Sequence, residues 1–330
     1  MRLRRADPNG PGYTRRRYGR GFRYLDESGR PLADPDELER VKALVIPPAW
    51  RGVWICPHPR GHIQATGVDA AGRTQYLYHP VWRAQRDAAK FDHVLAAAAR
   101  LPRLRTRVRA DLRGRGLGRE RVLAAGVALL DSGLFRVGGD EYASGDDATY
   151  GLATLLRSHV AFRRGQAVCS YLAKGGSTRT ATVTDPDVRA VLRALHRRPD
   201  PSPRLLAYRR GSDWREVRSD DVNAYLREAA GCDMTAKDFR TWHATVLAAV
   251  MLALEGPGGS PTRCKRVVAA VMREVAEELG NTPAVARKSY VDPRVVDLFH
   301  AGRVIPVPGP VEGCPAPPAV ERAVLKLLAD

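Results

Sequence analysis

Cysteine is scarce in this chain of 330 residues, and its five cysteines lie far apart. None of them forms a C-x-x-C pair, so the sequence indicates neither a disulfide framework nor a zinc ribbon. We expect reduced, mostly buried thiols, as in a cytoplasmic protein. The cysteines are Cys56, Cys169, Cys232, Cys264 and Cys314.

Long apolar stretches are also missing. The most apolar run, 244–254, is too short to span a bilayer, and no apolar segment follows the Arg-rich N-terminus. We therefore expect no secretory signal, no membrane partner and a cytoplasmic location. The glycine-rich segment 256–260 lacks the Gly-Lys-Ser/Thr that cradles phosphates, so we expect it to be a helix connector.

Acidic residues are too few to balance the basic ones, and the formal net charge is +18. Only seven of the 54 basic residues are lysines. A compositional bias of the genome can explain arginine in place of lysine, but it does not explain cations in excess of acids. Such a charge attracts polyanions and supplies much of the affinity for a nucleic-acid backbone. We expect a nucleic-acid partner, with binding that weakens steeply as salt increases.

The periodicity of apolar residues changes near residue 85. Before it, Asp34 and Pro35 mark a helix start, and alternation predicts strands at 52–56, 62–68 and 73–79. After it, a helical period dominates, interrupted by a strand pair at 166–173 and 178–184. The predicted helices are 81–99, 119–131, 147–160, 186–196, 220–229, 236–254, 264–279, 283–290 and 293–301.

These elements predict an α+β fold. A small β-rich N-terminal domain covers 1–85, and a large, mainly α-helical domain with an inserted β-hairpin covers 86–302. A Pro-rich tail at 303–330 contains a short helix over 319–328.

Tyr290 stands beside several cations near the end of this basic chain, so it is a candidate nucleophile for a phosphodiester. Metal-free phosphoryl transfer also needs donors for the nonbridging oxygens and an acid for the leaving oxygen. Arginine suits the first role, and lysine suits the second because nearby cations can lower the pKa of an ammonium group. Lys174 stands at the tip of the predicted glycine-rich hairpin. The acids Asp140, Glu141, Asp146 and Asp147 are assigned to a helix start rather than to a metal site.

Four segments place such residues in a defined order: LFRVG (134–138), LAKGG (172–176), KDFRTW (237–242) and 279–290. They contain Arg136, Lys174, Arg240, Asn281 and Tyr290, and this set resembles the catalytic residues of type IB DNA topoisomerases, specifically the small poxvirus-like bacterial form. The segments 67–80 and 150–155 resemble signatures of the same family. The resemblance extends over about residues 15–300.

The resemblance implies a role for each residue. Tyr290 would attack the scissile phosphate, giving a 3′-phosphotyrosine and a free 5′-hydroxyl. Arg136 and Arg240 would hold nonbridging oxygens, and Lys174, assisted by Arg136, would protonate the leaving oxygen. Most family members have histidine where Asn281 stands. An amide can donate a hydrogen bond but cannot carry a proton charge near neutrality, so transition-state hydrogen bonding is the role that stays open.

Each of these residues also has a structural alternative: Tyr290 could be a half-buried packing residue and Lys174 a solvated turn lysine. Arg136 could be a C-terminal cation of the helix that ends near Gly133, and Arg240 could lie on a helix surface. Asn281 could be a left-handed helix cap.

The predicted strand 73–79 carries three further candidates. Tyr76 and Tyr78 point in one direction and Gln75 in the other, because side chains alternate along a strand. In the family, the matching residues contact DNA, and glutamine is suited to reading adenine edges. Ordinary cross-strand packing is the alternative for the aromatic rings.

The resemblance implies a monomeric, nucleoid-associated bacterial isomerase that clamps duplex DNA, preferably supercoiled. It would relax positive and negative supercoils and would need neither ATP nor a metal, nor any other cofactor. A tyrosine recombinase is the closest alternative, but it usually has histidine at the position of Lys237. A noncatalytic basic DNA-binding protein and a metal-dependent nuclease are more distant alternatives.

Overall fold

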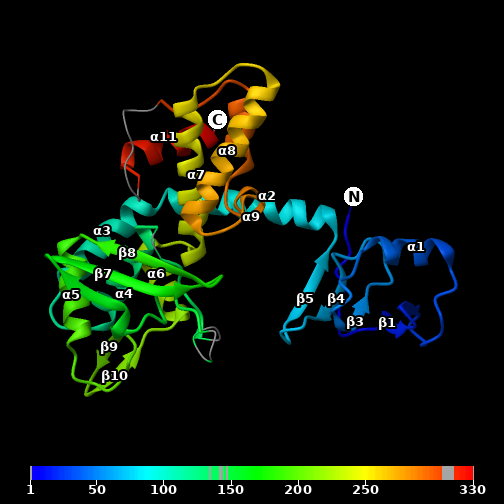
Figure 1. The fold of residues 1–330 in the computed structure, drawn as a ribbon, viewed down its shortest axis with the longest axis horizontal. Coiled ribbons are helices and arrows are strands. Elements are labelled where there is room, and N and C mark those ends of the chain that lie inside the picture. Colours follow the sequence, from blue (N-terminus) through cyan, green and yellow to red (C-terminus); the bar gives the residue numbers. More distant parts are fainter. Residues whose placement is uncertain are drawn as a thin grey trace. The chain divides into compact units, whose positions relative to one another are not determined.

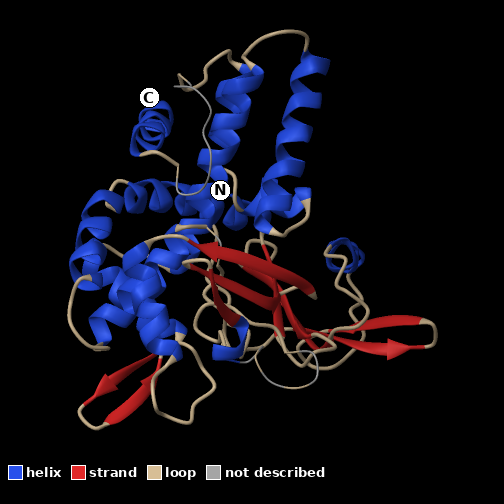
Figure 2. Cartoon of the chain, turned by 60° about the vertical axis from the view of Figure 1, so that its left-hand side comes forward, coloured by secondary structure: helices blue, strands red, loops and turns tan. Residues whose placement is uncertain are grey.

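The computed structural model describes residues 2–133, 135–140, 143, 145, 148–306 and 316–329. The chain divides into two compact units, residues 1–91 and 92–330, and the boundary falls within helix α2 (Pro80–Ala98) (Figure 1). The first unit is built on a sheet and the second is mainly helical (Figures 1 and 2), which confirms the predicted α+β fold.

The first unit contains an antiparallel sheet with the strand order β2-β1-β3-β4-β5 and one helix that precedes β3. The elements are β1 (Tyr13–Tyr18), β2 (Gly21–Leu25), α1 (Pro35–Ala43), β3 (Arg51–Ile55), β4 (Ile63–Val68) and β5 (Thr74–Tyr78). Strands β3 to β5 confirm the prediction. The Asp34 carboxylate caps α1 by accepting from the amides of Asp36 and Glu37. A small core of Val41, Ile46, Val53, Ile55 and Ala65 joins helix and sheet.

The hairpin of β1 and β2 was not expected, because its residues are arginine-rich and lack an apolar alternation. It is held by its ladder and by cations stacked on rings: the Arg15 guanidinium lies 4.1 Å from the centroid of Phe22, and that of Arg23 lies 3.8 Å from the centroid of Tyr18. Stacking of this kind can replace hydrophobic packing on an exposed hairpin.

The second unit is a bundle of helices with two small antiparallel sheets. Its helices are α3 (Leu101–Leu112), α4 (Arg119–Asp131), α5 (Pro186–His196), α6 (Ser219–Ala230), α7 (Ala236–Glu255), α8 (Pro261–Leu279), α9 (Pro283–Ser289), α10 (Pro293–His300) and α11 (Pro318–Ala329). Its strands are β6 (Val160–Arg163), β7 (Gln166–Ala173), β8 (Ser177–Val183), β9 (Ala207–Arg210) and β10 (Asp213–Glu216). The expected hairpin is β7–β8, whereas α3, β6 and the β9–β10 pair were not anticipated.

The predicted helix over 147–160 is wrong. The described residues 148–159 form an irregular segment that ends in a short 3₁₀ turn, η2 (Arg157–His159), and Val160 begins β6. The amide of Leu152 donates to the carbonyl of Arg136 (2.8 Å) and that of Ala153 donates to the carbonyl of Val137 (2.7 Å). Every residue from Gly151 to Leu155 is buried, so the apolar pattern reflects burial on all sides and tertiary contacts override the helical preference.

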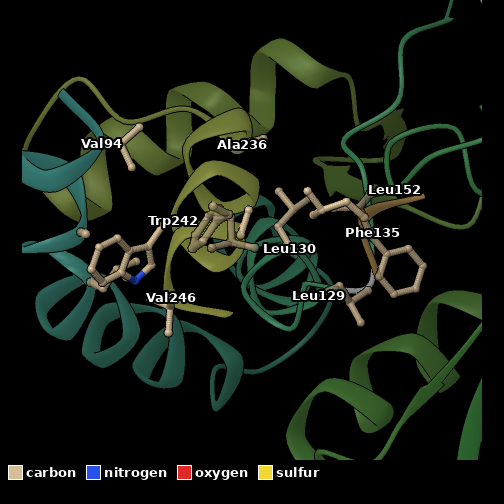
Figure 3. Packing of buried hydrophobic residues seen from close by; sticks show 14 of the residues in the cluster. Val94, Leu129, Leu130, Phe135, Leu152, Ala236, Trp242 and Val246 are labelled. Carbon is tan, nitrogen blue, oxygen red and sulfur yellow. The ribbon is translucent and has the colours of Figure 1, made fainter. Parts of the chain in front are cut away.

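One core extends through the second unit. Phe135 and Leu152, from the two adjoining segments, enter it together with Trp242 and Val246 of α7 (Figure 3). Helix α11, which lies in the region expected to be a tail, packs on α7 (Figure 1) and buries Val320, Val324 and Leu328.

A buried ionic cluster fixes α11 to α3 and α7. Glu321 accepts hydrogen bonds from Arg105 and from the indole of Trp242, and Arg105 also pairs with Asp131 of α4. Removal of one partner from such a cluster leaves a buried charge poorly compensated.

We predict that Glu321→Ala lowers the free energy of unfolding by about 3 kcal/mol, since Arg105 keeps only one of its two carboxylates. In a unit of this size the melting temperature should fall by roughly 6–12 °C in a calorimetric scan. The exposed neighbour Arg322 is the control, and Arg322→Ala should change the melting temperature little. Equal effects of the two substitutions would contradict the role given to Glu321.

Two glycines let the segment of Arg136 lie directly on residues 150–153. A Cβ on Gly151 would stand 2.5 Å from the Cα of Gly138, closer than carbon atoms approach without displacement. A Cβ on Gly126, in α4, would meet only Leu152 and Leu206 at ordinary contact distances, the nearer at 3.4 Å.

We therefore predict that Gly151→Ala destabilises the protein by about 1–3 kcal/mol through overpacking. In contrast, Gly126→Ala should be neutral or stabilise by up to about 1 kcal/mol, because alanine favours a helix. Denaturant unfolding of both variants checks the pair, and a tolerated alanine at 151 would refute the close approach.

Candidate active site

The C-terminal end of α8 organises the site. Gly280 adopts a left-handed conformation with φ of 60° and closes the helix. The amides of Gly280 and Asn281 donate to the carbonyls of Glu277 (2.9 Å) and Ala276 (2.8 Å), the pattern of a Schellman cap. The next three carbonyls, those of residues 278, 279 and 280, point beyond the helix and need other donors.

Three arginines from distant elements supply those donors. Arg179 of β8 donates to the carbonyl of Glu278 at 3.0 Å, and Arg240 of α7 donates to that of Leu279 at 2.7 Å. Arg136 donates to the carbonyls of Leu279 (3.1 Å) and Gly280 (2.9 Å). Cations are favoured at this negative end of a helix dipole. Arg136 is thus a C-terminal cation, although of α8 and not of the helix that precedes it.

The place of Arg136 is set by its neighbours in the chain. Its carbonyl accepts from Leu152, and the adjacent Phe135 ring stacks on Tyr171 of β7 with centroids 5.7 Å apart. These contacts hold the segment of Arg136 against both residues 150–153 and the β7–β8 hairpin.

Tyr290 directly follows α9 as its C-terminal cap and lies beside Arg240, whose guanidinium carbon is 5.4 Å from the centre of the phenol ring. Thr245, further along α7, fixes the backbone there. Its hydroxyl accepts from the amide of Asp292 (3.1 Å), and its single proton is shared between the carbonyls of Thr241 (2.8 Å) and Tyr290 (3.3 Å). The helix that carries Arg240 therefore also holds the segment that carries Tyr290.

The arginines of the site are half-buried, and little nearby negative charge compensates their positive charge. Burial lowers the pKa of the Arg240 guanidinium to about 10, and the charge of Arg136 adds to that shift. Burial also lowers the pKa of Arg136. Among the described residues, no carboxylate forms an ion pair with Arg136, Arg179 or Arg240. Three arginines shielded elsewhere in the unit do have carboxylate partners: Arg105, Arg157 and Arg198.

A small pocket unites these cations with the lysine predicted from the sequence. Its lining includes Arg136, Lys174, Arg179 and Arg240, together with Gly280. Lys174 is exposed at the tip of the β7–β8 hairpin. Four basic side chains around one small pocket favour an anionic ligand, and the planar guanidinium matches the oxygens of a phosphate.

Asn281 joins the set through Arg136, which donates to its Oδ1 at 3.2 Å. Because a guanidinium only donates, this contact orients the amide with its Nδ2 turned away from Arg136. That nitrogen is buried, and it has no hydrogen-bond partner among the described residues. Gly280, not Asn281, has the left-handed conformation of the cap.

Of the five residues expected in catalysis, Arg136, Lys174 and Arg240 thus share a pocket, Asn281 contacts Arg136, and Tyr290 contacts Arg240. Arg179 was not anticipated. It lies in the predicted strand after the Lys174 turn, but nothing in the local pattern shows which distant segment it meets.

The three residues expected to contact DNA lie on β5 of the first unit. Tyr76 and Tyr78 are exposed on one side of the strand, with nearly parallel rings 5.9 Å apart. Gln75 lies on the other side and donates to the carboxylate of Asp69 at 2.9 Å. The two tyrosines offer an exposed aromatic surface, and Gln75 is engaged in the turn that precedes its strand.

The remaining features concern metal binding, membrane-spanning helices and the cysteines. No group of three metal-binding side chains and no helix suited to crossing a membrane occurs among the described residues. Glu141, Asp146 and Asp147 of the acidic patch lie outside them, as do Leu134 and Cys314. Cys56, Cys169 and Cys264 are buried free thiols, and Cys232 is a half-buried one.

Family models and a known protein match this chain. Residues 21–69 match the model of the bacterial DNA topoisomerase IB N-terminal domain, and residues 79–297 match that of the eukaryotic DNA topoisomerase I catalytic core. The chain is 27% identical over 297 residues to DNA topoisomerase 1B of Acanthamoeba polyphaga mimivirus, with 88% of each chain covered. The core match includes all the residues around the pocket. This chain belongs to the type IB DNA topoisomerase family, and it is an isomerase that acts on DNA.

Proposed function

We propose that the protein relaxes supercoiled DNA through a transient 3′-phosphotyrosyl bond at Tyr290. The phenol oxygen of Tyr290 forms a bond to the scissile phosphorus while the bond from phosphorus to the 5′ oxygen breaks. The phenolic proton passes to solvent, and Lys174 gives a proton to the leaving 5′ oxygen. The broken strand rotates, and the 5′-hydroxyl then attacks the phosphotyrosine and restores the original bond. One ester replaces another, so no ATP is needed.

The observation that carries this proposal is the set of half-buried arginines that have no carboxylate partner in the described part of the chain. Each of Arg136 and Arg240 uses a single nitrogen for the α8 carbonyls, and the Nε of Arg240 is buried without a partner among the described residues. The remaining donors suit the nonbridging oxygens of a phosphate, whose charge increases in the transition state. Protein cations then take the role that metal ions have in other phosphoryl transferases.

Asn281 has a narrower role than histidine would have. The orientation set by Arg136 leaves the amide nitrogen as a donor, which can hold one phosphoryl oxygen. It stabilises charge in the transition state without moving a proton.

The first unit supplies contacts away from the reacting phosphate. We propose that Tyr76 and Tyr78 present their exposed rings to DNA and that Gln75 contacts a base edge after releasing Asp69. The substrate is duplex DNA of either supercoil sign, in the bacterial nucleoid. A single chain carries all five catalytic candidates, which is consistent with action as a monomer.

We predict that Tyr290→Phe abolishes plasmid relaxation, with a loss of at least about four orders of magnitude, because the nucleophile is removed. The wild type should relax plasmids of either supercoil sign in excess EDTA. Tyr208→Phe, at a half-buried tyrosine of β9, is the matched control and should stay active. Activity retained by Tyr290→Phe contradicts the mechanism. Strand exchange between two defined sites would favour a recombinase, and relaxation lost in EDTA would favour a metal-dependent enzyme.

A second prediction tests whether Lys174 donates the proton to the leaving 5′ oxygen. Cleavage of an oligonucleotide by Lys174→Ala should slow by about 10²–10⁴-fold, the usual contribution of a general acid. If sulfur replaces the bridging 5′ oxygen, the variant should cleave within a few fold of the wild type, because a thiolate leaves without protonation. Lys326→Ala, at an exposed lysine of α11, should cleave both substrates normally. Equal slowing on both substrates by Lys174→Ala would assign the proton to another group.

A further inference from the structure

Arg179 links two parts of the site that lie far apart along the chain. It lies on β8, in the hairpin that carries Lys174, and it donates to the carbonyl of Glu278, 99 residues further along the chain. Glu278 lies two residues before Gly280, the cap of α8, after which the chain continues to Asn281 and Tyr290.

The contact between Arg179 and the cap is close. A Cβ on Gly280 would stand 2.2 Å from Nη2 of Arg179, so the guanidinium lies directly against the glycine backbone. A side chain at position 280 would displace it. Arg179 is half-buried, and it has no ion pair with a carboxylate among the described residues.

The strand register places Arg179 at the base of the hairpin tip. It pairs with Tyr171, and the pairs Leu172–Thr178 and Ala173–Ser177 follow before the turn. Cross-strand partners share one face of a sheet, so Arg179 is a neighbour of the buried Tyr171 ring. The charge of Arg179 opposes the rise in the pKa of Tyr171, to about 12, that burial causes.

The two glycines of the tip form no side-chain contacts that would place it. Gly175 and Gly176 have φ of 98° and 76°, and a Cβ on either would meet open space. The carbonyl of Leu172 accepts from the amide of Tyr150 at 2.8 Å, which holds the end of β7 near the tip. On the β8 side, the side chain of Arg179 connects the hairpin to α8.

From these contacts we infer that Arg179 is a positioning residue for the proposed reaction. It fixes the hairpin that carries Lys174 relative to the segment that carries Asn281 and Tyr290, so that the ammonium group reaches the leaving oxygen. This inference rests on the proposed function, because it assigns Arg179 an effect on proton delivery by Lys174. A misplacement of about 1 Å in such an arrangement can slow a reaction by about 10²-fold.

The test compares oxygen and sulfur leaving groups in single-turnover cleavage. Arg179→Ala should cleave the normal oligonucleotide about 10–100-fold more slowly than the wild type, and the substrate with bridging 5′ sulfur within about 3-fold of it. Noncovalent DNA affinity, measured with Tyr290→Phe as the background, should change little. The control is Arg163→Ala, which removes an exposed arginine from β6, at the end of the sheet opposite the hairpin tip, and should cleave both substrates normally.

Equal slowing on both substrates would overturn the inference, because Arg179 would then act on the phosphate itself or on the fold as a whole. Normal cleavage of the oxygen substrate would also overturn it. Should Arg179→Ala fail to fold, as judged by its thermal melt, Arg179→Lys provides the same comparison. It keeps the charge but loses the planar fork, and a loss confined to the oxygen substrate is again expected.

The same assay separates this inference from the proposed function. If the wild type forms no adduct at Tyr290, or if sulfur does not rescue Lys174→Ala, the proposed function fails whatever Arg179→Ala does. If both behave as predicted and sulfur does not rescue Arg179→Ala, only the role of Arg179 fails.

Discussion

The exposed carbonyls at the end of α8 are the constraint on which the site depends. A helix end must find donors for its last carbonyl groups. Here the Schellman cap satisfies two of them, and arginines from α7, β8 and the segment after α4 satisfy the next three. Capping α8 and assembling the site are therefore the same event, because the interactions that close the helix also bring the three guanidinium groups together.

This arrangement leaves the positive charges of the site arginines without a carboxylate partner among the described residues. Elsewhere in the second unit, the shielded arginines Arg105, Arg157 and Arg198 pair with carboxylates. At the site, carbonyl dipoles replace carboxylates, and burial lowers the pKa of Arg136 and Arg240 instead. A carbonyl orients a guanidinium without neutralising it, so the charge remains available to a phosphate. The stability lost by burying such cations is recovered in part through the α8 dipole.

Much of this could be predicted from the sequence. Helices such as α7 and α8 carry a clear apolar period, and the β7–β8 hairpin has alternation and a glycine turn. The catalytic candidates were proposed from their residue types and their order along the chain. Both can be seen in the sequence without knowledge of the fold. The resemblance to type IB topoisomerases was correct for the same reason.

The errors share a physical cause. The apolar pattern of residues 147–160 predicts a helix, but residues 151–155 are buried and this part is hydrogen-bonded to the segment of Arg136. Hairpin β1–β2 was missed because stacked arginines take the place of an apolar face. Arg179 could be placed on a strand, yet its contact with Glu278 depends on the tertiary fold, which a local pattern does not encode.

Identification of the residue that becomes linked to DNA tests the central claim most directly. The wild type is mixed with duplex DNA, the reaction is stopped with denaturant, and the protein is digested and analysed by mass spectrometry. The account predicts one modified peptide, with the 3′ end of the cleaved strand esterified to Tyr290. An adduct on any other residue, a linkage to the 5′ end, or relaxation without an adduct would contradict it.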